Sequence, residues 1–191
     1  MYAGKPHYVI TLALIVINIV VYVYLAILSG NPFVISNRVL MVFGQFNFAV
    51  LKFGLYYQLV SAMFVHLNLG HLLINMFWLY ILGVQVERLM EGYDYILIYF
   101  IGGLLGNVLT LVIYPLNTIS GGASGAIFSL FGAILMYGGA FHGKVGTSLI
   151  YAFLILIMNS AFNANIIAHM GGLIVGLIYG YYKGKLVIKE L

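Results

Sequence analysis

A serine and two histidines lie within long apolar runs of this sequence, where polar side chains are rare. Ser124 begins the run "SGAIFSLFGAIL", and His71 and His169 occur in two other apolar runs. Ionisable groups in a hydrophobic interior are costly, so they mark candidate functional sites. A serine hydroxyl becomes a nucleophile when a neighbouring histidine takes its proton. These residue types therefore point to nucleophilic catalysis, provided that the fold brings Ser124 and His169 together.

Such a site also needs hydrogen-bond donors for a tetrahedral oxyanion. Ser124 opens a predicted helix, so its backbone N–H is free of intrahelical bonding and benefits from the helix dipole. His71 and Asn75 are spaced i, i+4, which puts both side chains on one helix face as further donors. Gly122 and Gly125 permit a tight turn and a close approach of substrate backbone. The sequence thus offers an oxyanion site around Ser124.

Each of these residues also has a structural explanation. His169 alone can hydrogen-bond to a neighbouring helix, and His71 with Asn75 can join two helices. The "GASG" stretch around Ser124 can simply allow two helices to pack closely, and Asn107 is assigned to packing in the same way. Catalysis is favoured over packing only if these side chains converge, which depends on the elements that carry them.

The composition determines what kind of elements these are. The chain has 191 residues, of which 64% are hydrophobic and 6% are charged, and its mean hydropathy is +1.11. So few charges cannot cover the surface of a soluble domain, so we expect an all-α integral membrane protein in a lipid bilayer. The absence of Cys excludes thiolate metal sites and a cysteine nucleophile. The basic residues form no helix face or patch, which argues against a nucleic-acid partner.

The apolar runs predict six membrane-spanning helices. They lie at about 8–28, 67–86, 95–114, 124–140, 147–162 and 166–182. The first run is longer than a signal-peptide core and lacks a cleavage site, so we expect it to be retained. The connection 29–66 is apolar and is expected to lie in the membrane interface as short amphipathic helices. We expect one transmembrane domain over 1–191, with its core at about 55–182.

The charge distribution predicts an orientation with both termini in the cytoplasm. Six of the eight basic residues then lie inside: Lys5, Arg88, Lys144, Lys183, Lys185 and Lys189. Arg38 and Lys52 lie outside. The second, fourth and sixth spans all run inward, so His71, Ser124 and His169 share one depth in the outer half of the membrane. The inner halves are predicted to be almost wholly apolar, which argues against a channel or transporter.

This orientation also excludes a catalytic triad. All four acidic residues fall on the inner side, away from the predicted site: Glu87, Glu91, Asp94 and Glu190. A dyad of Ser124 and His169 is what remains. Phe128, one turn after Ser124, is placed to stack on the His169 ring and hold it. Gly172 and Gly176 give the sixth span a small-residue face that allows it to approach the fourth.

Four motifs in this order resemble the rhomboid family of intramembrane serine proteases: "HLNLGHLLIN", "GVQVE", "GASG" and "AHMGGLIVG". The resemblance covers about residues 55–182. It implies a six-helix rhomboid fold with a membrane-embedded loop between the first two spans, and a dyad of Ser124 and His169. It also implies an oxyanion site formed by the Ser124 N–H, His71 and Asn75, with His66 supporting the cavity.

The same resemblance implies an activity. Family members cleave transmembrane helices of other membrane proteins near the outer face, through an acyl-enzyme, without metal, nucleotide or other cofactor. We therefore expect a serine endopeptidase of the plasma membrane with transmembrane protein substrates. The alternative is a catalytically silent rhomboid-like adaptor that binds transmembrane helices in the same groove.

Two positions depart from the family pattern. A Trp-Arg pair usual in the loop is replaced by Tyr57 and Gln58, which removes the usual loop contacts. Phe128 stands where several members have Tyr, so stacking is kept and a hydroxyl contact is lost. Neither change affects Ser124 or His169, so the protease remains the favoured hypothesis.

Overall fold

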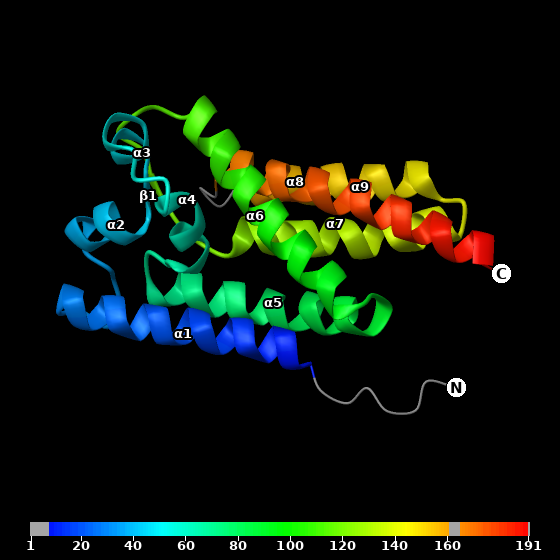
Figure 1. The fold of residues 1–191 in the computed structure, drawn as a ribbon, viewed down its shortest axis with the longest axis horizontal. Helices are drawn as coiled ribbons and strands as arrows, with labels where there is room; N and C mark the ends of the chain where they lie inside the picture. The colour runs from blue at the N-terminus through cyan, green and yellow to red at the C-terminus, as the bar shows by residue number, and fades with distance from the viewer. Residues whose placement is uncertain (1–7, 161–164, 191) are drawn as a thin grey trace.

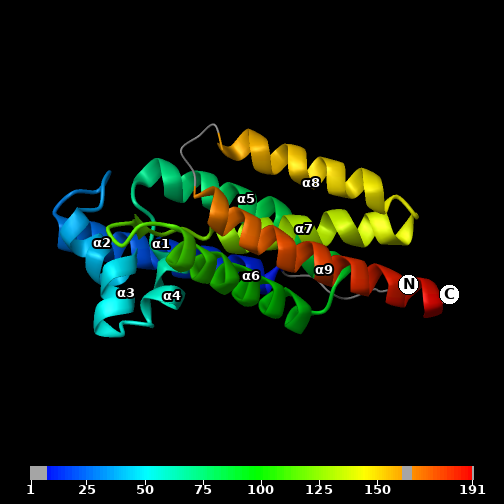
Figure 2. The same cartoon turned by 90° about the horizontal axis from the view of Figure 1, so that it is seen from above.

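The computed structural model describes residues 8–160 and 165–190, and this part of the chain is mostly helical (Figures 1 and 2). Each predicted span corresponds to a helix: α1 (Val9–Ser29), α5 (Leu69–Leu89), α6 (Gly92–Ile113), α7 (Ser124–Phe141), α8 (Val145–Ser160) and α9 (Ile166–Glu190). In the described residues, α1, α5, α6 and α7 are long and apolar enough to cross a membrane, and α8 is a shorter apolar helix. The α9 helix continues well past its predicted end at residue 182.

Side-chain caps determine where two of the spans begin. Asn68 precedes α5, and its Oδ1 accepts a hydrogen bond from the His71 N–H at 2.8 Å. Glu91 and Asp94 form a reciprocal capping box at the start of α6. The sequence predicts a start at residue 95, which is late because the first turn of α6 is polar and the prediction followed the apolar run.

The connection between α1 and α5 forms short helices, as the sequence predicts. They are α2 (Asn37–Phe43), α3 (Asn47–Phe53), α4 (Gln58–Ser61) and a 3-10 turn, η1 (Ala62–Phe64). A two-residue strand, β1 (Gln45–Phe46), pairs antiparallel with β2 (Ile119–Ser120), which the sequence did not predict. Figure 1 shows α2, α3 and α4 gathered at one end of the bundle, opposite the end where α1 begins and α9 finishes. The β1–β2 pair connects this region to the segment just before Ser124.

Tyr57 and Gln58, the residues that depart from the family pattern, hold this connection together. The Tyr57 hydroxyl donates a hydrogen bond to the Val42 carbonyl at 2.8 Å. The fully buried Gln58 donates to the Met41 carbonyl at 2.8 Å and accepts from the Phe46 N–H at 2.9 Å. The pair therefore provides loop contacts of its own by satisfying backbone groups that would otherwise be unpaired.

The centre of the bundle is α7, which packs against α5, α6, α8 and α9. Glycines bring α7 and α9 into backbone contact: a Cβ at Gly172 would lie 1.8 Å from the Gly125 carbonyl oxygen, and one at Gly176 would lie 2.0 Å from that of Ser129. No side chain fits at these positions, so the predicted small-residue face is the α7–α9 interface. The Ser129 hydroxyl donates to the Ile98 carbonyl at 2.8 Å, which gives this buried serine a packing role.

The prediction that the halves of the spans remote from Ser124 are almost wholly apolar is wrong. Thr11 is fully buried, and its N–H and hydroxyl donate to Glu87 Oε1 at 2.5 and 2.8 Å. Asn18, Tyr95 and Tyr99 are fully buried in the same region. Thr11 and Asn18 lie in α1, and Tyr95 and Tyr99 lie in α6, so the hydropathy pattern of either helix alone does not reveal that they meet. The two halves of the spans therefore do not differ in polarity in the way that was predicted, and this prediction gives no argument against a channel or transporter.

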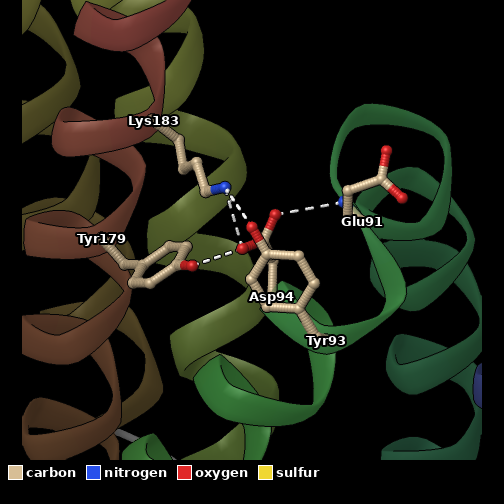
Figure 3. A network of polar contacts seen from close by, with 5 residues as sticks. All are labelled: Glu91, Tyr93, Asp94, Tyr179 and Lys183. Atoms are coloured by element: carbon tan, nitrogen blue, oxygen red, sulfur yellow. Dashed lines mark hydrogen bonds and ion pairs between the residues drawn. The ribbon is translucent and has the colours of Figure 1, made fainter.

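A second polar cluster joins α6 to α9 at the end remote from Ser124. Figure 3 shows Asp94 accepting hydrogen bonds from the Tyr179 hydroxyl and from Lys183, whose Nζ lies 2.9 Å from Oδ1. Lys183 also donates to the Tyr93 hydroxyl at 3.2 Å. Asp94 is almost completely buried, and these partners compensate its charge.

Candidate active site

The structure brings Ser124 and His169 into hydrogen-bond contact. Ser124 is the first residue of α7, and His169 lies in the first turn of α9 and is almost fully buried. The distance between Ser124 Oγ and His169 Nε2 is 2.8 Å. A serine hydroxyl and an imidazole nitrogen at this distance can pass a proton between them.

The His169 ring is held by stacking. The Phe128 ring lies parallel to it, with 4.3 Å between the centroids and 13° between the planes, as the sequence predicts. For Nε2 to accept the Ser124 proton, the ring must carry its own proton on Nδ1. That Nδ1 is buried and finds no hydrogen-bond partner among the described residues.

The acidic side chains whose contacts the structure describes are remote from this pair. Glu87 is bonded to Thr11 near the end of α5, and Asp94 is bonded to Tyr179 and Lys183 at the start of α6. Within residues 8–160 and 165–190, no three His, Asp or Glu side chains converge in the way that metal ligands do.

His71 lies beside Ser124, with Gly122 between them. A Cβ built on Gly122 would lie 2.8 Å from His71 Cε1, 3.0 Å from its Nε2 and 3.6 Å from Ser124 Oγ. Gly122 also has a φ of +136°, which L side chains rarely adopt, and its N–H donates to the Ala62 carbonyl at 2.8 Å. Only glycine can turn the chain here and leave the space between the two polar groups open.

Asn75 lies one turn further along α5 and is nearly fully buried. Its Nδ2 donates one hydrogen bond to the His71 carbonyl at 2.8 Å, and its Oδ1 finds no partner among the described residues. An amide nitrogen carries two N–H groups, so one donor is left. The structure thus places His71 next to Ser124 and shows no direct contact between Asn75 and Ser124.

His66 contacts the backbone just before Ser124. It is fully buried, and its Nε2 accepts a hydrogen bond from the Ala123 N–H at 3.5 Å, a long distance for such a bond. The His66 ring packs edge-on against His71, with 5.2 Å between the centroids. This position fits the supporting place that the family resemblance implies.

Gly125 lies at the contact between α7 and α9, where the sequence predicts that small residues let the two helices approach. The residue is buried, and a Cβ built on it would lie 3.2 Å from the Ala168 carbonyl oxygen. Gly172 approaches the Gly125 carbonyl from the same side. Its small size therefore serves the α7–α9 contact, although it also contributes to the lining of a small pocket.

This pocket lies beside Ser124 and measures about 20 Å³, the room of roughly one water molecule. It is lined by Gly103, Asn107, Ser120, Gly121, Gly122, Ser124, Gly125, Asn165 and Ala168. Asn107, which the sequence assigns to packing, donates to the Leu59 carbonyl at 2.8 Å and also borders this pocket. Ser120 and Asn165 are polar neighbours of Ser124 that sequence reasoning missed.

The sequence contains a helix-capping signal that could have drawn attention to Asn165. It stands immediately before the apolar run that contains His169, where Asn is a preferred N-cap. In the structure its Oδ1 accepts a hydrogen bond from the Ala168 N–H at 3.0 Å. The Asn165 side chain thus stabilises the start of the helix that carries His169.

The comparisons with known proteins identify the family to which this chain belongs. A family model described as the Rhomboid domain matches residues 54–186. The chain is 31% identical over 182 residues to "Rhomboid protease GluP" of Bacillus subtilis (strain 168), and the match covers 91% of this chain and 34% of that protein. It is 33% identical over 136 residues to "Putative rhomboid protease YdcA" of the same organism, with 67% of each chain covered.

A plant relative, "Rhomboid-like protein 11, chloroplastic" of Arabidopsis thaliana, is 41% identical over 80 residues, with 42% of this chain and 29% of that protein covered. The chain therefore spans only about a third of the length of some curated relatives that it matches. The family model nevertheless covers both the His71 and His169 motifs and the helices that carry them. Together with the membrane-spanning helices, this match shows that the chain is a membrane protein of the rhomboid family.

Proposed function

We propose that this chain is an intramembrane serine endopeptidase that uses Ser124 as nucleophile and His169 as general base and acid. The observation that carries the proposal is the distance of 2.8 Å between Ser124 Oγ and His169 Nε2 at adjacent helix starts. Two relatives whose names describe rhomboid proteases support it. A half-buried hydroxyl and a buried imidazole in this geometry need no carboxylate, metal or nucleotide to begin acyl transfer.

The reaction would follow the usual two steps of serine proteolysis. Ser124 Oγ attacks the scissile carbonyl carbon while its proton passes to His169 Nε2. The tetrahedral intermediate collapses as His169 gives that proton to the leaving amine, and an ester remains on Ser124. Water then attacks the ester with His169 as base, and the free carboxylate leaves as Ser124 regains its proton.

Three donors are proposed for the oxyanion: the Ser124 N–H, His71 and Asn75. The closeness of His71 to Ser124 across Gly122 supports the first two. Asn75 would use the N–H that its bond to the His71 carbonyl leaves over. Phe128 would hold the His169 ring, and His66 would support the backbone before Ser124 through the Ala123 N–H.

We further propose that all six long helices span the membrane, with both termini in the cytoplasm of a cell whose plasma membrane holds the protein. Charge supports this orientation, because Arg38 in α2 and Lys52 in α3 lie at the opposite end of the bundle from Arg88 and Lys183. Large exposed apolar side chains around α2–α4 support embedding of that connection in lipid: Phe33, Phe53 and Tyr56. Ser124 would then lie below the outer surface.

The proposed substrates are transmembrane helices of other membrane proteins, cut near the outer face. A helix in the bilayer has all its backbone groups paired, so cleavage requires that it unwinds locally at the site. Polar groups around Ser124 would support that step, because Ser120 and Asn107 border the adjoining pocket.

A fluorophosphonate probe tests the proposed nucleophile. The purified protein should be labelled covalently, and Ser124→Ala should abolish the labelling. Ser129→Ala is the matched control, because Ser129 lies in the same helix, is bonded to the Ile98 carbonyl and should not react. Equal labelling of wild type and Ser124→Ala would overturn the proposal. A folded wild type that binds transmembrane helices but is neither labelled nor active would favour the silent adaptor.

A further inference from the structure

Among the described residues, the His169 ring has no partner for the hydrogen bond that usually orients a catalytic histidine. Its Nδ1 has no partner among the described residues, and the parallel stack on Phe128 fixes the tilt of the ring but lets it slide in its own plane. The location of Nε2 relative to Ser124 must therefore come from the backbone of the first turn of α9.

Asn165 accepts two hydrogen bonds from backbone N–H groups in that first turn. Its backbone carbonyl accepts the His169 N–H at 3.1 Å, and its Oδ1 accepts the Ala168 N–H at 3.0 Å. Both hydrogen bonds end on one residue, so the position of Asn165 determines where the peptide units of Ala168 and His169 lie.

Asn165 is itself tied to α6. Its Nδ2 donates to the hydroxyl of Thr110 at 3.0 Å, and this fully buried hydroxyl donates in turn to the Gly106 carbonyl at 2.8 Å. One turn away, a Cβ at Gly106 would lie 2.5 Å from the Ala168 carbonyl oxygen, so the two backbones touch. The first turn of α9 is thus held against α6 by a hydrogen-bond chain and a close backbone contact.

We propose that Asn165, acting through Thr110, is the positioning residue that sets His169 at bonding distance from Ser124. This inference rests on the proposed protease function of the same site. In this role the chain Gly106–Thr110–Asn165 replaces the carboxylate that the dyad lacks, but it acts on the backbone of His169 and not on its ring.

Two substitutions remove the hydrogen bond between Asn165 and Thr110, and both leave an oxygen at position 165 that can cap α9. Asn165→Ser keeps an N-cap oxygen but is too short to reach Thr110, and Thr110→Val keeps the shape of the side chain but removes the acceptor. Each should lower kcat by about 10- to 100-fold with little change in KM, because a misplaced base affects the transition state and not substrate binding. Thr110→Ser retains the hydroxyl and should restore most of the activity.

A matched control exists at the other end of the same helix pair. Tyr179 in α9 donates to Asp94 in α6, so Tyr179→Phe also removes one α6–α9 hydrogen bond while keeping the ring (Figure 3). If Thr110 only stabilises the bundle, Tyr179→Phe should lower kcat as much as Thr110→Val. If Thr110 positions His169, Tyr179→Phe should leave kcat within about twofold of wild type.

A second readout does not depend on turnover. With ¹⁵N-histidine labelling in detergent micelles, the imidazole signal of His169 should shift or broaden in Thr110→Val and Asn165→Ser and remain in place in Tyr179→Phe. An unmoved signal in Thr110→Val, or equal movement in Tyr179→Phe, would overturn the positioning role. Movement of the signal as expected, in a protein that cleaves no substrate, would leave the positioning role in place and remove the protease function.

Discussion

Ser124 and His169 lie 45 residues apart in the chain, and their side chains are 2.8 Å apart in the structure. They meet because both stand at helix starts, and α7 and α9 run side by side in the same direction from one end of the bundle (Figures 1 and 2). Glycines set the register of the two helices, since Gly172 fits over the Gly125 carbonyl just below the pair. Several consequences of this geometry are open to measurement.

Phe128 should matter through its ring alone. Phe128→Leu removes the parallel stack on His169, and we expect kcat to fall about tenfold, in line with the roughly 0.5–1.5 kcal/mol that an aromatic pair contributes. Phe128→Tyr keeps the ring and should stay within a few-fold of wild type. Cleavage kinetics in detergent decide between these outcomes, and full activity of Phe128→Leu would remove the assigned role.

The proposed oxyanion donors should affect the transition state selectively. His71→Ala should lower kcat by about 10²–10³-fold, and Asn75→Ala should lower it in the same direction, with KM little changed in both. Thermal unfolding of each variant serves as the control for folding. An unchanged kcat in either variant would show that the residue does not stabilise the oxyanion.

Gly122 should tolerate no side chain. In Gly122→Ala the new Cβ is strained at a φ of +136° and occupies the space between His71 and Ser124, so we expect labelling and cleavage to be lost. Gly138→Ala is the matched control, because nothing lies within 4 Å of its Cβ position in α7. Its activity should be unchanged, and its stability should rise by up to about 1 kcal/mol. An active Gly122→Ala enzyme would contradict the geometry of the site.

The α7–α9 interface should be sensitive to a single methyl group. In Gly176→Ala the Cβ would meet the Ser129 carbonyl oxygen at 2.0 Å, so we expect a loss of about 1–3 kcal/mol in the free energy of unfolding. Gly146→Ala in α8, whose Cβ position is open, should be at least as stable as wild type. Denaturant titration of both proteins in the same detergent tests this difference, and equal stability would mean that the interface is looser than the glycine contacts indicate.

The sequence was sufficient for the main elements and for much of the candidate site. Long apolar runs predicted the six long helices, and the scarcity of polar residues within them drew attention to Ser124, His71 and His169. Because the second, fourth and sixth spans were predicted to run in the same direction, these three residues were predicted to lie at one depth. The distance of Phe128 from Ser124, one helical turn, was enough to predict its stack on His169.

What the sequence missed depends on packing between elements. The β1–β2 pair has two residues in each strand, which is too few to show the alternation of apolar and polar residues that predicts a strand. The Thr110–Asn165 bond joins residues on different helices, and each looks like an isolated polar residue until the helices pack. The polar partners Thr11 and Glu87 were hidden for the same reason.

Cleavage of a model transmembrane helix in proteoliposomes tests the central claim most directly, with the cut located by mass spectrometry and Ser124→Ala as the control. We expect wild type to cut once, in the part of the helix that lies in the outer half of the bilayer, and Ser124→Ala to leave the substrate intact. Cleavage by Ser124→Ala at the wild-type rate, or no cleavage by a folded wild type across a panel of helices, would contradict the account.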